Sequence, residues 1–152
     1  MQQPIVISGA GILGCYISCA LSLQGIDSIV LEKKDDEVED SVRTITLNPF
    51  SKNLLDKIGI ENDYSMINKM EVKDFDGTGK IVFKSSEIGM DHLAYVSDFA
   101  ALLMAVRKKA SEKILYKEEI IDIDNKGDLN EVTLSSGKVI KTNLIISSDG
   151  KN

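Results

Sequence analysis

The sequence has few of the residues that metal centres and disulfide frameworks need. Its 152 residues include one histidine, His92, and two cysteines. Zinc sites take several Cys, His or carboxylate ligands, so we expect no metal site. Cys15 and Cys19 are four residues apart in a predicted helix, where their side-chain bonds run parallel and a disulfide is geometrically poor. We therefore predict two small, buried or half-buried thiols.

Positive charge and long apolar runs are also scarce. The chain has 18 Lys+Arg against 24 Asp+Glu, a net charge of −6. Nucleic-acid binders need a basic surface, so we expect no nucleic-acid partner. The longest apolar region, residues 12–23, is interrupted by serines and falls short of the ~20 residues of a membrane-spanning helix. No positive residues precede Ile5, as they would in a signal peptide, so a cytoplasmic protein is expected.

What remains is the composition of a folded protein, 43% hydrophobic and 28% charged. The length predicts one domain with one core. Residues 5–7 are apolar and β-branched, which indicates a buried strand. A glycine turn, a helix over residues 12–24 ended by Gly25, and a strand over residues 28–31 follow. This order predicts a right-handed crossover between parallel strands.

The middle of the chain has signals of other elements. Asn48-Pro49 predicts the capped start of a short helix that ends before Gly59. Alternating apolar residues on both sides of a turn at residues 76–79 predict a hairpin. Ser97 is predicted to cap a helix that continues through Val106. The basic residues 107–109 are expected to complement the negative end of that helix dipole.

The last third is rich in predicted strands. A short strand at residues 114–115 precedes a three-stranded meander, whose turns lie at residues 125–128 and 135–137. The apolar run at residues 144–146 is typical of a central parallel strand. The predicted class is α/β, a Rossmann-like FAD/NAD(P)-binding fold with a central parallel sheet, a β-meander and a hairpin insertion.

One motif carries chemistry. Gly9, Gly11 and Gly14 match G-x-G-x-x-G between the first strand and the first helix. The first glycine permits the tight turn, the second lets a pyrophosphate approach the backbone, and the third lets helix and strand pack closely. Glu32 ends the second strand 18 residues later, near the ~20 expected of an acid that binds ribose hydroxyls. The alternative is a turn with no ligand.

The acid disfavours a phosphate on the ribose 2′-hydroxyl, which leaves FAD or NAD. An NAD domain would continue with alternating helices and strands, whereas this chain inserts a hairpin and a meander. Four passages then carry a resemblance to a known family. They are residues 7–14 with 31–33, residues 40–48 with 54–59, residues 94–96, and residues 145–150.

These passages resemble the FAD-dependent aromatic-ring monooxygenases. Residues 43–47 resemble an Arg-x-x-x-Leu segment of the ubiquinone-biosynthesis hydroxylases and favour that branch. The resemblance implies a set of FAD-binding residues. They are Gly9, Gly11 and Gly14 at the pyrophosphate, Glu32 with the Lys33 backbone at the adenosine ribose, Arg43 toward the flavin, the Ile120 backbone at adenine, and Asp149 near the pyrophosphate and the path of the reductant.

Two of these residues have other interpretations. Arg43 is otherwise a surface partner of the acidic run at residues 35–40, and Asp149-Gly150 is otherwise a common turn. One departure concerns residues 98–101, which lack the Arg or Gln that the family uses there to contact FAD. No catalytic side chain is expected, because the flavin performs the chemistry.

The resemblance covers residues 1–152 but only the N-terminal, FAD-binding part of the family. It implies an oxidoreductase that hydroxylates an aromatic ring, a prenylated phenol of the ubiquinone pathway, with NAD(P)H as reductant. The substrate and C-terminal portions have no counterpart, so we expect a second polypeptide to carry them, or an inactive chain. A prenylated substrate implies at most peripheral contact with the inner membrane. The alternatives are another FAD- or NAD-dependent oxidoreductase and a non-enzymatic nucleotide-binding remnant.

Overall fold

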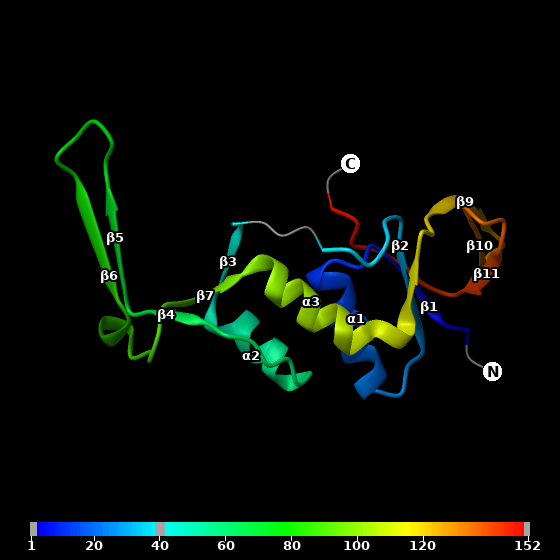
Figure 1. Ribbon diagram of the computed structural model, residues 1–152, viewed down its shortest axis with the longest axis horizontal. Helices are drawn as coiled ribbons and strands as arrows, with labels where there is room; N and C mark the ends of the chain where they lie inside the picture. The colour runs from blue at the N-terminus through cyan, green and yellow to red at the C-terminus, as the bar shows by residue number, and fades with distance from the viewer. Residues whose placement is uncertain (1–2, 39–41, 151–152) are drawn as a thin grey trace. The chain divides into compact units, whose positions relative to one another are not determined.

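The computed structural model describes residues 3–38 and 42–150. The chain divides into two compact units, Met1–Asp40 with Leu103–Asn152 and Ser41–Leu102. Figure 1 labels most of their elements. Those of the first unit are β1 (Ile5–Ser8), α1 (Ile12–Leu23), β2 (Ser28–Glu32), η2 (Ser111–Lys113), β8 (Ile114–Tyr116), β9 (Ile120–Asn125), β10 (Asn130–Leu134), β11 (Val139–Thr142) and β12 (Ile145–Ser147).

The second unit has fewer elements, and α3 (Phe99–Ala110) contributes its first residues to this unit and the remainder to the first. The other elements of the second unit are β3 (Thr44–Leu47), α2 (Pro49–Lys57), β4 (Ser65–Ile67), β5 (Lys69–Lys73), β6 (Lys80–Lys84), η1 (Ser85–Ile88) and β7 (Ala94–Asp98). Residues 39–41, which include the end of the predicted acidic loop, lie outside the described residues.

A four-stranded parallel sheet with the order β12-β1-β2-β8 organises the first unit. The predicted parallel crossover from β1 through α1 to β2 is therefore confirmed. The prediction that residues 144–146 form a central strand is wrong in one respect. Among the described residues β12 pairs with β1 alone and lies at the sheet edge, and Leu144 is 49% exposed.

The two faces of this sheet are covered by different layers. Side chains alternate between the faces of a strand. Val6 and Leu31 share one face and pack against Val132 and Leu134 of the meander. The meander is antiparallel with the order β11-β10-β9, as predicted. The first unit therefore buries its core between the parallel sheet and the meander.

Helix α1 covers the other face at close range. The Ser18 hydroxyl of α1 lies 2.9 Å from the Ser28 hydroxyl of β2, and both side chains are buried. Cys15 and Cys19 are free and buried on the same helix, as predicted. Small side chains at these positions let the helix approach the sheet closely, which brings its N-terminus to the carboxyl ends of β1 and β2.

The second unit contains a three-stranded antiparallel sheet with the order β3-β7-β4. The Asn48 side chain accepts a hydrogen bond from Ser51 N at 2.7 Å and caps α2, as predicted. The predicted cap of α3 is wrong by one residue, because Asp98, not Ser97, accepts from Ala101 N at 2.7 Å. Ser97 still belongs to β7, where it is paired with Ile45.

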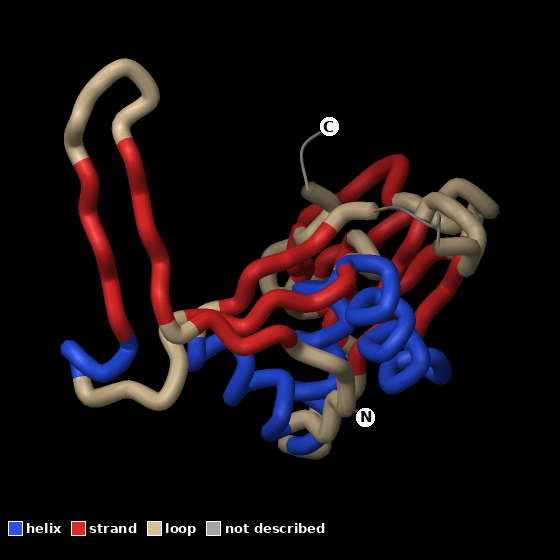
Figure 2. Tube along the Cα trace, turned by 60° about the vertical axis from the view of Figure 1, so that its left-hand side comes forward, coloured by secondary structure: helices blue, strands red, loops and turns tan. Residues whose placement is uncertain are grey.

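The predicted hairpin is confirmed as β5 and β6, a two-stranded ribbon (Figure 2). Its two faces differ in character. On one face Glu71 forms ion pairs with three lysines, the shortest being 3.0 Å to Lys80. The other face carries Met70, Val72, Ile81 and Phe83. Val72 and Ile81 are more than half exposed, and Phe83 is 49% exposed.

Across residues 3–38 and 42–150, no helix combines the length and apolar character that crossing a bilayer requires.

The buried core of the meander predicts that side chains on two of its strands contribute unequally to the free energy of unfolding. Leu134 on β10 is fully buried, whereas Val139 on β11 is 52% exposed. We expect Leu134→Ala to lower the free energy of unfolding by about 2–5 kcal/mol, because it leaves a cavity. Val139→Ala should cost less than about 1 kcal/mol. Urea denaturation followed by circular dichroism measures both, and equal losses would contradict this packing.

Candidate functional site

The glycine turn packs tightly against the segment that follows β12. Gly9 has a φ of +98°, a conformation that side chains disfavour. A Cβ at Gly9 would lie 2.7 Å from the Asp149 Cα. At Gly14, a Cβ would lie 2.1 Å from the Gly9 carbonyl oxygen and 2.6 Å from the Ser148 Oγ. Both glycines are therefore required by close packing, which the motif predicts for the third glycine.

Gly11 differs from the other two glycines. It occupies the N-cap position of α1 with a φ of −74°, and a Cβ there would meet nothing within 4 Å. No side chain of the described residues caps this helix. The first N–H groups of a helix carry partial positive charge and favour anions. The turn therefore combines open space and free donors, the arrangement that a pyrophosphate group requires.

Ser148 fixes the turn from the other side, which sequence reasoning missed. Its hydroxyl lies 2.8 Å from the Ser8 carbonyl oxygen and 3.0 Å from the Gly9 carbonyl oxygen. Its backbone N–H also donates to Ser8 O at 2.8 Å. The sole sequence signal was its position before Asp149-Gly150.

Glu32 lies at the end of β2 and is hydrogen-bonded to the same turn. Its Oε2 accepts from Ala10 N at 3.1 Å and from the Arg107 guanidinium at 3.3 Å. Its Oε1 accepts from Lys34 N at 3.1 Å. Arg107 also donates from Nε to Ala10 O at 2.9 Å. Sequence reasoning gave Arg107 a part in the helix dipole alone and missed these contacts.

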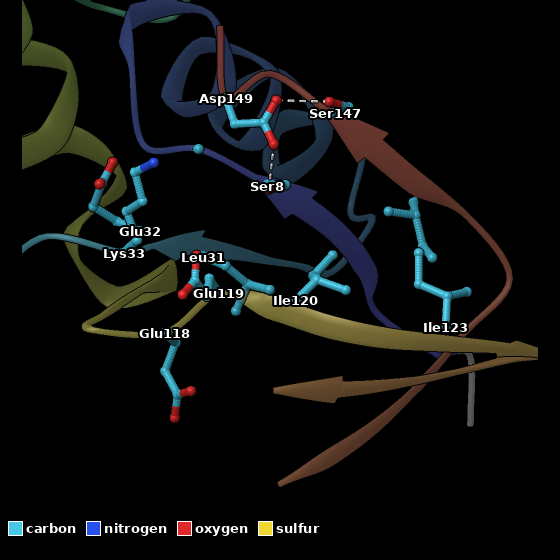
Figure 3. Close-up of a pocket in the computed structure, with 12 residues that line it drawn as sticks. Ser8, Leu31, Glu32, Lys33, Glu118, Glu119, Ile120, Ile123, Ser147 and Asp149 are labelled. Carbon is cyan, nitrogen blue, oxygen red and sulfur yellow. Dashed lines mark hydrogen bonds between the residues drawn. The ribbon is translucent and has the colours of Figure 1, made fainter. Parts of the chain in front are cut away.

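A pocket of about 360 Å³ opens beside the turn (Figure 3). It is lined at the carboxyl ends of β1, β2 and β12 and at the start of β9. Open α/β sheets bind ligands outside the carboxyl ends of their strands. Five predicted site residues line this pocket, and they are Gly9, Glu32, Lys33, Ile120 and Asp149.

Asp149 stands at one end of the pocket. Its carboxylate accepts from Ser147 Oγ at 2.8 Å and from Ser8 Oγ at 3.1 Å (Figure 3). These two hydrogen bonds lower the pKa of Asp149. Hydrogen bonds from Ser136 and Ser135 likewise lower the pKa of Glu118. Asp149 and Glu118 therefore favour the ionised form, so phosphate groups fit at the glycine turn rather than beside these two carboxylates.

Arg43 belongs to the second unit, whereas the other predicted site residues belong to the first. It is exposed, and its guanidinium lies 4.3 Å from the centroid of the Phe99 ring. Phe99 N donates to Arg43 O at 3.0 Å. Phe99 begins α3 within residues 98–101, the segment that lacks the family's Arg or Gln, and its ring lies against the Arg43 guanidinium.

Comparison with known proteins assigns the family. Residues 2–150 match the FAD binding domain family, and the chain belongs to it. The mitochondrial ubiquinone biosynthesis monooxygenase COQ6 of Danio rerio is 26% identical over 97% of the chain and 36% of its own length. The 3-demethoxyubiquinol 3-hydroxylase of Escherichia coli K12 is 26% identical over 99% of the chain and 42% of its own length.

A solved structure has the same fold. Klebsiella pneumoniae R204Q HpxO, complexed with FAD, aligns with 98% of the chain and 40% of its own chain at a TM-score of 0.77 and 18% identity. These findings confirm the predicted resemblance, the Rossmann-like fold and FAD as the family's cofactor. The chain spans about two-fifths of the length of the curated relatives described above.

The glycine packing predicts a strong effect at Gly14. A Gly14→Ala side chain would overlap the Gly9 carbonyl oxygen, so the helix must move away from the turn. We expect a loss of several degrees in the thermal midpoint, because a backbone atom cannot move aside cheaply. Gly79→Ala is the matched control, since its Cβ would meet Asp74 at an ordinary 3.6 Å. Equal midpoints for the two variants would refute the packing.

Burial of the Cys15 thiol predicts how the stability of the fold depends on pH and how the folded protein resists alkylation. Burial raises the pKa of the Cys15 thiol to about 12. The neutral buried thiol favours the folded state below a pH of about 8.5, the ordinary thiol pKa, and this contribution declines as the pH rises toward 12. Native protein at pH 7.5 should resist alkylation at Cys15 by iodoacetamide, and protein in urea should react. Mass spectrometry measures both, and rapid native modification would contradict the burial.

Proposed function

We propose that this chain is the FAD-binding part of a flavin-dependent monooxygenase that hydroxylates an aromatic ring. The substrate we propose is a prenylated phenol of the ubiquinone pathway, in line with the names of two relatives. The observation that supports this proposal is the open glycine turn beside Glu32, at the carboxyl ends of β1 and β2. The domain proposed for residues 1–152 is the N-terminal, FAD-binding part of such an enzyme.

The proposed contacts follow from the geometry. The turn at Gly9, Gly11 and Gly14 would receive the pyrophosphate, because space and helix N–H groups coincide there. Glu32 would bind the adenosine ribose, since a carboxylate oxygen has two lone pairs and Oε1 has one protein donor among the described residues.

Four further residues complete the proposed cofactor contacts, and their roles come from the resemblance. They are the Lys33 backbone at the ribose, the Ile120 backbone at adenine, Asp149 near the pyrophosphate, and Arg43 toward the flavin. Lys33, Ile120 and Asp149 line the pocket, which supports their inclusion. The Asp149 carboxylate is ionised, so it would accept a hydrogen bond rather than contact phosphate oxygens directly.

The chain's own residues would bind and orient the cofactor. Bound flavin supplies electron transfer from NAD(P)H and the oxygen chemistry, so no protein side chain is proposed as catalytic. The glycine turn would fix the pyrophosphate, and Glu32 would fix the adenosine end. Together they would hold the cofactor in one orientation.

We propose that the substrate-binding remainder comes from polypeptide outside this sequence, carried on a second chain. Two surfaces of the described residues support this. The edge of β12 pairs with no strand on its outer side, and the β5–β6 ribbon exposes an apolar face. A two-stranded ribbon is marginally stable alone, so a covering surface would stabilise it. A prenylated substrate would bring the assembly into peripheral contact with a membrane.

Gly11 provides the sharpest test of cofactor binding. A Gly11→Ala methyl group would occupy open space next to the turn, where the pyrophosphate would lie. Because φ is −74°, the fold should tolerate alanine with a change of about 1 kcal/mol or less. We expect FAD to bind wild type and Gly79→Ala equally, and Gly11→Ala at least about tenfold more weakly.

Isothermal titration with FAD measures the dissociation constants, and a visible flavin spectrum of the gel-filtered mixture shows retention. If wild type binds adenine nucleotides but no FAD, the chain is a nucleotide-binding remnant and the proposed function fails. Equal FAD affinity of wild type and Gly11→Ala would remove the glycine turn from the site.

A further inference from the structure

We infer that Arg107 is a positioning residue that sets the glycine turn and Glu32 in the conformation that binds the cofactor. The inference rests on the proposed function, because it concerns the same site. Neither sequence pattern nor resemblance placed Arg107 in this role. Its side chain is 11% exposed, and that of Glu32 is 13% exposed, so the pair is largely shielded from water.

The contacts form a closed ring through three residues. Arg107 Nε donates to the Ala10 carbonyl oxygen at 2.9 Å, and Arg107 Nη2 donates to Glu32 Oε2 at 3.3 Å. The ring closes where Ala10 N donates to the same Glu32 oxygen at 3.1 Å. Both polar backbone groups of Ala10 are therefore fixed, one by the acid and one by the guanidinium.

Fixing the Ala10 carbonyl also fixes the next amide. The Ala10 carbonyl and the Gly11 N–H belong to one planar peptide group, and in a trans peptide they point in opposite directions. No cis peptide bond occurs among the described residues. Since the carbonyl points at Arg107, the Gly11 N–H points away from it. Arg107 therefore fixes the direction of a donor at the helix N-terminus, and open space lies beside the same residue.

The same guanidinium organises the ribose acid. Oε2 of Glu32 is occupied by Ala10 N and Arg107, and Oε1 receives Lys34 N. Each carboxylate oxygen has two lone pairs, so Oε1 keeps an acceptor site for a ribose hydroxyl. Removing Arg107 would remove a positive partner from a carboxylate with little access to water, and the carboxylate would then turn toward other donors.

Only an arginine suits these contacts. The planar guanidinium donates in two fixed directions at once, whereas a lysine ammonium is a single point charge. The Tyr116 ring supports the group, with its centroid 5.7 Å from Arg107 Cζ. Tyr116 pairs with Glu32 in adjacent strands, so the sheet holds the acid and the ring side by side, and α3 carries Arg107 to both.

The test compares four variants by isothermal titration with FAD. Arg107→Met removes the donors and the charge. Arg107→Lys keeps the charge but lacks the planar guanidinium that donates in two fixed directions. Lys108→Met removes one charge from an exposed position on the same helix. Val106→Ala creates a cavity at a fully buried position of that helix and reports how far lost stability alone weakens binding.

We expect Arg107→Met to weaken FAD binding by about tenfold to a hundredfold, the range of lost charged hydrogen bonds. Arg107→Lys should be intermediate, and Lys108→Met and Val106→Ala should stay within about twofold of wild type. A folded Arg107→Met that binds FAD like wild type overturns the inference. If Arg107→Met does not fold, wild-type affinity in Arg107→Lys overturns it.

A second measurement separates this inference from the proposed function. In ligand-free ¹⁵N NMR spectra, Arg107→Met or Arg107→Lys should shift the Ala10 and Gly11 amide signals, and Lys108→Met should not. If wild type binds no FAD, the proposed function fails, yet these signals still decide whether Arg107 positions the turn. Unchanged Ala10 and Gly11 signals in the folded Arg107 variants would overturn the positioning role.

Discussion

The absence of a side chain at Gly14 is the constraint on which the site depends. Only a hydrogen fits between helix α1 and the Gly9 carbonyl oxygen, which a Cβ would approach to 2.1 Å. This contact places the helix N-terminus at the carboxyl end of β1. It also lets Ser148 reach the carbonyl oxygens of the turn. A helix held further away would leave its N–H groups too distant to share a ligand with β2.

Charge then divides the site into two parts. The glycine turn presents backbone donors and the partial positive charge of α1, while the pocket beside it is lined with carboxylates such as Glu32 and Asp149. Arg107 joins the parts, because it contacts both the turn and Glu32. A dinucleotide matches this division, since its pyrophosphate is anionic and its ribose hydroxyls are hydrogen-bond donors.

Local signals predicted most of the fold. The Asn48-Pro49 cap, the β5–β6 hairpin and the glycine turn followed by Glu32 each depend on residues close in sequence. Arg107 escaped prediction because its partner Glu32 is 75 residues away, and only the packing of α3 beside the sheet brings them together. The cap of α3 was misplaced because Ser97 and Asp98 are both good caps, and the length of β7 decides between them. The edge position of β12 was missed because an apolar run does not reveal which strands flank it.

We propose that the glycine turn and Glu32 bind the adenosine diphosphate half of FAD. A ¹⁵N NMR titration of the ¹⁵N-labelled chain with ADP tests this proposal. We expect the amide signals of Gly9, Gly11 and Ile120 to shift and to saturate at one ADP per chain, and we expect no shifts along the β5–β6 ribbon. Saturation that leaves the glycine-turn amides unmoved, or no binding at millimolar ADP, would contradict it.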